Sequence, residues 1–192
     1  MKLVELAMRT FFRYITKPNY AVLLVLLGLT SGVPAYAPSA MATELDEYRV
    51  KTAFIYNFLA FTQWPDWNEQ AFNMCVYGAE HFGREIDALQ EKTINDVPIR
   101  IIRIARLDEL KHCHALFFSQ SAQIQLSAML ESLRNAPFLT IADSANAASM
   151  GAMITMHLDQ NRVKFEINLR SARDAQLMIS SRLLQLATQV YQ

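Results

Sequence analysis

The chain has 192 residues, of which 52% are hydrophobic and 19% are charged, and its basic and acidic side chains balance to a formal net charge of zero. This composition is typical of a globular protein with one ordinary core. The basic side chains form no cluster, which excludes binding of nucleic acid through an electrostatic surface.

The first 42 residues have the order of a secretory signal peptide. Basic side chains precede an uninterrupted apolar run over residues 21–29, and residues 30–34 then break the helix. A membrane anchor is the alternative, but nine residues fall short of the roughly 20 that a spanning helix needs. Small residues at alternate positions mark two cleavage sites, 35–37 and 40–42, and we predict cleavage between Ala42 and Thr43.

Removal of residues 1–42 takes away four basic side chains and one acidic side chain, which leaves a formal charge of about −3 on residues 43–192. With no lipid-attachment cysteine near the cleavage sites, the mature chain is expected to be soluble. A bacterial periplasm is the expected compartment.

The mature chain begins with a helix predicted over residues 45–63. Its apolar side chains cover more than half of its circumference, which is a wider apolar surface than a helix with one buried face needs. We therefore expect this helix to pack on a sheet and also to offer a surface to a partner or ligand, with Phe54, Phe58 and Phe61 as candidate contact residues. Packing within the core is the simpler alternative.

Strands and helices alternate along the rest of the chain. They are expected, in order, as strand 72–77, helix 82–91, strands 97–104 and 115–118, helix 121–134, strand 138–141, strands 153–158 and 162–167, and a long closing helix from residue 171. This alternation predicts an α/β fold, a three-layer sandwich whose mostly parallel sheet has helices on both faces. The short connection at 159–161 allows only an antiparallel hairpin, which suits the edge of the sheet. Without an internal repeat or a linker, residues 43–192 form one domain.

The two cysteines, Cys75 and Cys113, each lie in or beside a predicted strand. An even number of cysteines in an exported protein favours a disulfide. Two buried free thiols are one alternative, and a metal site that adds His112 and His114 is another. The metal site is disfavoured because neighbouring side chains of a strand point to opposite faces.

Other residues that carry chemistry do not assemble into a catalytic site. His81 and His157 stand alone, Asp143-Ser144 is best explained as a turn after a strand, and the glycines at 78 and 83 lack the Lys-Ser/Thr of a phosphate loop. We therefore predict a protein that is not an enzyme, with no catalytic residue, no metal and no cofactor.

Taken together, the motifs resemble the YfiR-like family of periplasmic proteins. The resemblance covers nearly the whole mature chain, through the segments VKTAFIYNFLAFTQWP, CVYG, CHALFFS, LTIAD and GAMITMHLDQNRVKFEINLRSARDAQLMISSRLLQLA. Two departures stand out: residues 141–151 lack the second cysteine pair of some members, and Gly151-Ala152 replaces a frequent Gly-Gly.

The resemblance implies a regulator without enzymatic activity. Such a protein binds the periplasmic part of an inner-membrane diguanylate cyclase and represses synthesis of cyclic di-GMP, and thereby biofilm and exopolysaccharide. It also implies release by an OmpA-like outer-membrane lipoprotein and a redox-sensitive disulfide between Cys75 and Cys113. A second copy of the chain is a further candidate partner. The alternative function is a periplasmic small-ligand-binding protein or an accessory subunit of another sensor or outer-membrane receptor system.

Overall fold

Short apolar runs rich in aromatic and β-branched residues form the central strands, as the sequence predicts. The computed structural model describes residues 40–64, 70–79 and 82–192. The strands are β1 (Thr62–Gln63), β2 (Phe72–Tyr77), β3 (Thr93–Ile94), β4 (Val97–Ile104), β5 (Ala115–Phe118), β6 (Leu139–Asp143), β7 (Ile154–Asp159), β8 (Arg162–Asn168), β9 (Met178–Ile179) and β10 (Gln189–Tyr191). The helices are α3 (Ala40–Ala60), α4 (Gln123–Ser132), α5 (Leu169–Asp174) and α6 (Ser181–Leu186), with 3₁₀ helices η1 (Ile86–Glu91), η2 (Leu107–His112) and η3 (Gln120–Ala122).

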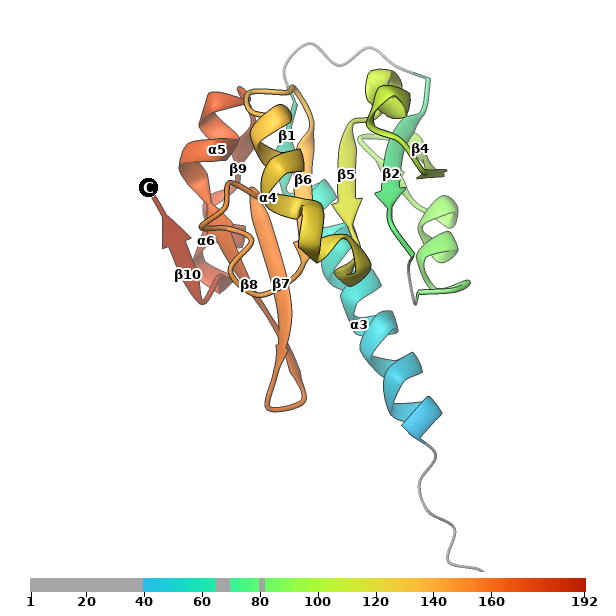
Figure 1. Ribbon diagram of the computed structural model, residues 1–192. Coiled ribbons are helices and arrows are strands. Elements are labelled where there is room, and N and C mark those ends of the chain that lie inside the picture. Colours follow the sequence, from blue (N-terminus) through green and yellow to red (C-terminus); the bar gives the residue numbers. More distant parts are fainter. Residues whose placement is uncertain (1–39, 65–69, 80–81) are drawn as a thin grey trace, which may run out of the picture. The chain divides into compact units, whose positions relative to one another are not determined.

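Eight of the described strands form one sheet in the order β10-β8-β7-β6-β5-β2-β4-β3 (Figure 1). From β4 through β2, β5 and β6 to β7, each neighbour is parallel. The pairs β7–β8 and β3–β4 are antiparallel, and β1 pairs with β9 in a separate antiparallel ribbon. The predicted α/β fold with a mostly parallel sheet is thus confirmed.

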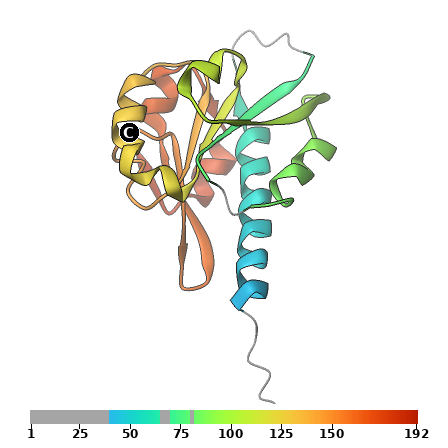
Figure 2. The ribbon, with the colours of Figure 1, turned by 45° about the vertical axis from the view of Figure 1, so that its right-hand side comes forward.

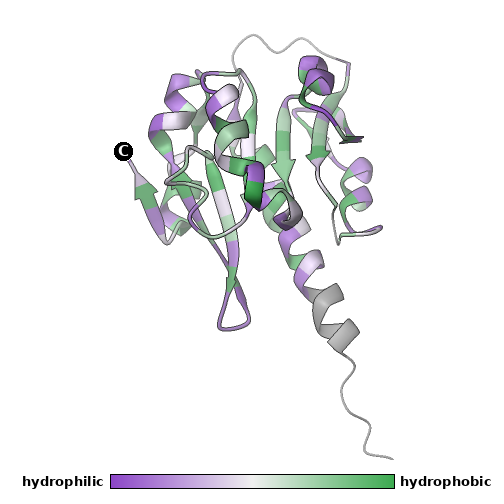
Figure 3. Ribbon diagram, viewed as in Figure 1, coloured by the Kyte–Doolittle hydropathy of each residue, from purple (hydrophilic) through white to green (hydrophobic). Residues whose placement is uncertain are grey.

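Alternate residues of the strands divide the core into two layers. In β2, Met74 and Val76 face one cluster, which also contains Phe58 of α3, whereas Cys75 faces the other, which contains Leu126 of α4. This alternation follows from the pleat of a strand, in which successive side chains point to opposite faces. Figure 2 shows α3 and α4 on the two faces, and in Figure 3 the central strands are largely hydrophobic.

The β7–β8 hairpin lies toward one end of the sheet, with β10 parallel to β8 on its outer side. The turn places Gln160 and Asn161 in the left-handed region, with φ values of 47° and 58°. Two consecutive residues with positive φ match the right-handed twist of the strands and fix the register of the hairpin.

The prediction of one long closing helix is wrong. Residues from 169 onward form α5, β9, α6 and β10 instead. Gln176, with a φ of 62°, follows the end of α5, and the Ser180 hydroxyl accepts the N–H of Leu183 to cap α6. The apolar spacing is real, but pairing of β9 with β1 and of β10 with β8 takes these residues out of helical geometry.

The predicted helix at 82–91 is shorter than expected, because only η1 at residues 86–91 is regular. The turn at Gly151-Ala152 requires glycine at its first position, where φ is 111°. Ala152 is buried there and donates its backbone N–H to Ala147, so a side chain is accommodated at the second position.

The predicted signal peptide lies almost entirely outside the described residues. The proposed cleavage point between Ala42 and Thr43 falls in the first turn of α3. Within the described part of the chain, no helix has the length and apolar character needed to cross a membrane.

Candidate functional site

A groove runs between α3 and the β7–β8 hairpin. Its volume is about 410 Å³. It is lined by Glu47, Val50, Phe54, Leu158, Asn161, Arg162 and Val163. We call this groove the hairpin groove. We call its apolar lining, Val50, Phe54, Leu158 and Val163, the floor, and its charged and amide lining, Glu47, Asn161 and Arg162, the rim.

The three predicted contact residues of α3 are placed differently. Phe54 is half-buried and lines the hairpin groove. Phe58 is fully buried against Phe165, with ring centroids 5.0 Å apart, so it belongs to the core. Phe61 is half-buried beneath the guanidinium of Arg182, which lies 5.7 Å from its ring centroid. Of the three, only Phe54 therefore offers surface to the groove.

The remaining apolar wall of the groove was not predicted from the sequence. Val50 and Leu158 are 45% and 44% exposed, and with Phe54 they line one groove, so they form a patch and not isolated surface residues. Their positions on one helix and one hairpin, over 100 residues apart, give no local pattern. Only the fold brings them together.

A buried ion pair fixes α3 next to this groove. The Lys51 ammonium donates to both carboxylate oxygens of Asp143, at 2.8 and 2.7 Å, and it also lies 2.6 Å from Glu47. Lys51 and Asp143 are 3% and 7% exposed. Burial acts to lower the pKa of Lys51, but the hydrogen bonds and charges of Asp143 and Glu47 outweigh it and raise the pKa above 10.5.

The sequence analysis explained Asp143-Ser144 as a turn after a strand and did not identify the partner of Asp143. Asp143 ends β6, where parallel sheets ordinarily bind ligands. Its carboxylate is instead occupied by Lys51, from a helix 92 residues earlier. The position of Lys51 among the apolar residues of α3 could have predicted this pair, because a buried lysine needs a partner of opposite charge.

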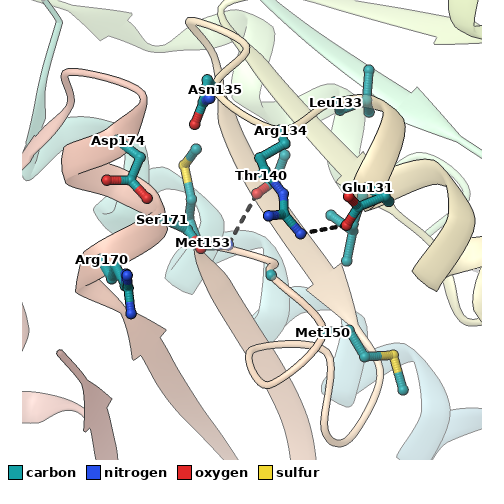
Figure 4. Close-up of a pocket in the computed structure, with 12 residues that line it drawn as sticks. Glu131, Leu133, Arg134, Asn135, Thr140, Met150, Met153, Arg170, Ser171 and Asp174 are labelled. Carbon is teal, nitrogen blue, oxygen red and sulfur yellow. Dashed lines mark hydrogen bonds and ion pairs between the residues drawn. The ribbon is translucent and has the colours of Figure 1, made fainter.

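A smaller polar pocket lies between α4, the loop before β7, and α5 (Figure 4). Its volume is about 170 Å³. Arg134 pairs with Glu131 on one side, and Arg170 and Asp174 of α5 stand on the other. Within the described residues, the side chains of Arg170 and Asp174 make no hydrogen bond or ion pair. This pocket suits a small charged molecule better than an apolar one.

A disulfide joins Cys75 in β2 to Cys113, which lies directly after η2 and two residues before β5, with Cα atoms 5.8 Å apart. Cys75 is fully buried and Cys113 is half-buried. Among the described residues, no group of three or more His, Cys, Asp or Glu is placed to hold a metal ion. Cys113 is the more exposed of the two bonded cysteines.

The residue after Cys113 connects several elements. His114 Nδ1 accepts the backbone N–H of Asn73 at 2.9 Å, and its carbonyl accepts the indole N–H of Trp64 at 3.2 Å and the N–H of Leu139 at 2.9 Å. Phe72 stacks on the His114 ring. The disulfide therefore lies next to contacts that hold β2, β5, β6 and the segment after β1 together.

A family model described as YfiR/HmsC-like matches residues 48–188 of the chain. The match covers α3 from Tyr48 onward, every strand of the sheet except β10, both cysteines and the hairpin groove except Glu47. Members of this family are periplasmic regulators of diguanylate cyclases, and the family is not one of enzymes.

Two solved structures are similar in fold. A conserved domain protein from Vibrio cholerae is 10% identical with a TM-score of 0.51, over 74% of this chain and 60% of that one. The ABC domain from Streptococcus pneumoniae, solved in complex with L-Trp, is 12% identical with a TM-score of 0.49, over 62% of this chain and 55% of that one. The chain thus spans little more than half the length of either structure, and the first supports the fold alone.

Proposed function

Because the chain belongs to the YfiR/HmsC-like family, we propose that it represses an inner-membrane diguanylate cyclase by binding the periplasmic part of that enzyme. The match over residues 48–188 is the observation that carries the proposal. Repression lowers cyclic di-GMP and thereby limits biofilm and exopolysaccharide. Release of the repressor by an OmpA-like outer-membrane lipoprotein completes the proposed switch.

Deletion of the gene in its own bacterium is expected to raise cellular cyclic di-GMP, measured by mass spectrometry of nucleotide extracts. The full-length gene supplied on a plasmid should restore the lower concentration. A version that lacks residues 1–42 serves as the matched control and should fail to restore it, because the repressor then stays on the wrong side of the membrane. An unchanged concentration after deletion, in a strain whose cyclases are expressed, would contradict the proposal.

The N-terminal 42 residues are proposed to be a signal peptide that is removed during export. The intact mass of the periplasmic protein is expected to be that of residues 43–192, and two hydrogens lighter than the same protein after reduction. A mass that retains residues 1–42 would argue against cleavage. An unchanged mass on reduction would argue against the disulfide.

Redox sensitivity is proposed for the disulfide between Cys75 and Cys113. Support comes from the half-buried position of Cys113 and from its neighbour His114, which bonds to β2 and to Trp64. Loss of the bond would loosen these contacts without removing any side chain.

A periplasmic small-ligand-binding protein is the second candidate function. The polar pocket favours it, since Arg170 and Asp174 present opposite charges to the same small cavity. If this were the main function, deletion would leave cyclic di-GMP unchanged, so the deletion experiment also decides between the two candidates.

A further inference from the structure

On the α3 side of the sheet, a row of apolar side chains on the β7–β8 hairpin continues from the core to the protein surface. On this face of the hairpin, the cross-strand pairs Ile154–Ile167, Met156–Phe165 and Leu158–Val163 follow one another. The first two pairs are buried, and α3 covers Phe165 with Phe54 and Phe58. The third pair is equally apolar but lies at the surface, with Leu158 44% exposed. The row of apolar side chains therefore continues into the hairpin groove, where it is exposed to solvent and is still apolar.

The hairpin extends beyond its neighbour at this point. β6 ends at Asp143, opposite Met156, so residues 157–164 form a two-stranded projection (Figure 1). Lys164 pairs with Asp159 across the strands, and the two-residue turn fixes their register. On the other wall, Lys51 holds α3 to Asp143. Both walls are therefore fixed before anything binds, which reduces the entropy lost on binding.

The charges at the rim favour one sign of partner. The Glu47 carboxylate is engaged by Lys51, and Lys164 is engaged by Asp159. Arg162 is exposed, and within the part of the chain that the structure describes its side chain has no hydrogen bond or ion pair. Among the described side chains that line the groove, the Arg162 guanidinium is thus the ionic group left to pair with a partner, and it prefers a carboxylate in two-pronged geometry.

We propose that the hairpin groove is the docking site for a partner segment that places an apolar side chain on Val50, Phe54, Leu158 and Val163 and a carboxylate on Arg162. This inference rests on the proposed function, and it assigns the segment to the periplasmic part of the repressed cyclase.

The groove is the centre of a wider contact face. At about 410 Å³ it accepts side chains but cannot by itself supply the roughly 800 Å² that each partner of a stable complex buries. A second apolar groove of about 320 Å³ lies along the other side of α3, where Tyr56, Ala88 and Leu89 contribute to its walls. Ala53 is exposed and borders this second groove. Because its side chain is small, a partner has room to pass over α3 from one groove to the other. A rigid apolar centre with a surrounding rim is the usual form of a binding hot spot.

Binding of the exported chain to the purified periplasmic part of the cyclase tests the site. The cyclase to use is the one whose deletion abolishes the rise in cyclic di-GMP. Leu158→Asp is expected to weaken binding about 30-fold, and Arg162→Glu about tenfold. Substitution of the partner carboxylate by lysine should restore binding to Arg162→Glu alone. Both substituted positions are exposed, and circular dichroism should show an unchanged melting temperature for Arg162→Glu.

Two matched variants serve as controls. Ile124→Asp adds a carboxylate at an apolar side chain that is 97% exposed on α4, and Arg173→Glu reverses an exposed arginine on α5. Both should bind as the wild type does. If the wild type binds and the two groove variants bind equally well, the groove is not the docking site, although the proposed function stands. If the wild type binds no cyclase, both proposals fall. A dimer of the chain that Leu158→Asp dissociates would assign the groove to a second copy and overturn the proposed occupant.

Discussion

Substitution of Lys51 by methionine is expected to lower the free energy of unfolding by about 3–5 kcal/mol. The substitution leaves the Asp143 carboxylate in a site that is 7% exposed, without the ammonium that donates to both of its oxygens. An uncompensated buried charge accounts for most of the loss. Urea unfolding at pH 7, followed by circular dichroism, measures it.

The double variant Lys51→Met with Asp143→Leu is the control for this experiment. Because it removes both charges, it should recover most of the stability lost in the single variant. A single variant as stable as the wild type would show that the pair makes no net contribution. A double variant as unstable as the single one would assign the loss to packing.

The pH dependence follows from the direction of the pKa shift. The pKa of Lys51 is raised above 10.5 in the folded protein, so its ion pair contributes fully below about pH 10.5. The contribution is lost as the pH rises through the folded pKa. The difference in the free energy of unfolding between the wild type and Lys51→Met should therefore be constant from pH 7 to about pH 10.5. It should become smaller only at higher pH.

Loss of the disulfide is expected to lower the free energy of unfolding by about 4 kcal/mol, for a bond that joins residues 38 positions apart. The bond restricts the unfolded chain, and it also lies beside the contacts that His114 makes with β2 and Trp64. Cys113→Ser tests this with little change in packing, since Cys113 is half-buried, whereas Cys75 is fully enclosed.

The measurement compares urea unfolding of the two proteins with and without dithiothreitol. Reductant should bring the wild type close to Cys113→Ser and leave that variant unchanged. A wild type that reductant does not destabilise would contradict the expected contribution. Residues 141–151 contain no second cysteine pair, so no other bond would mask the effect.

The central strands and the hairpin could be predicted because their signals are local. A buried strand needs only a short apolar run, and Phe72–Tyr77 and Ala115–Phe118 have the predicted bounds. The predicted three-residue connection permits only an antiparallel hairpin, and in the structure it is a turn of two residues, Gln160 and Asn161. The prediction of a closing helix was wrong for the opposite reason, because β9 and β10 are stabilised by pairing with strands that are far away in the sequence.

The candidate site depended on the fold in the same way. An excess of apolar residues on α3 predicted that one side of this helix does more than pack on the sheet, and of the three candidate residues only Phe54 lines the hairpin groove. Phe58 could not be told from Phe54 by spacing, because both lie on the helix face toward Phe165 and differ only in depth.

The sequence by itself determined the alternation of strands and helices as far as the hairpin, the mostly parallel sheet and the resemblance to a family of regulators. Each depends on residue types at fixed spacing along one stretch of chain. The tertiary structure alone decided that Lys51 neutralises Asp143, and that Val50 and Leu158 form one groove beside Arg162. These contacts join elements about 100 residues apart, and only the packing of α3 across the sheet brings them within reach of one another.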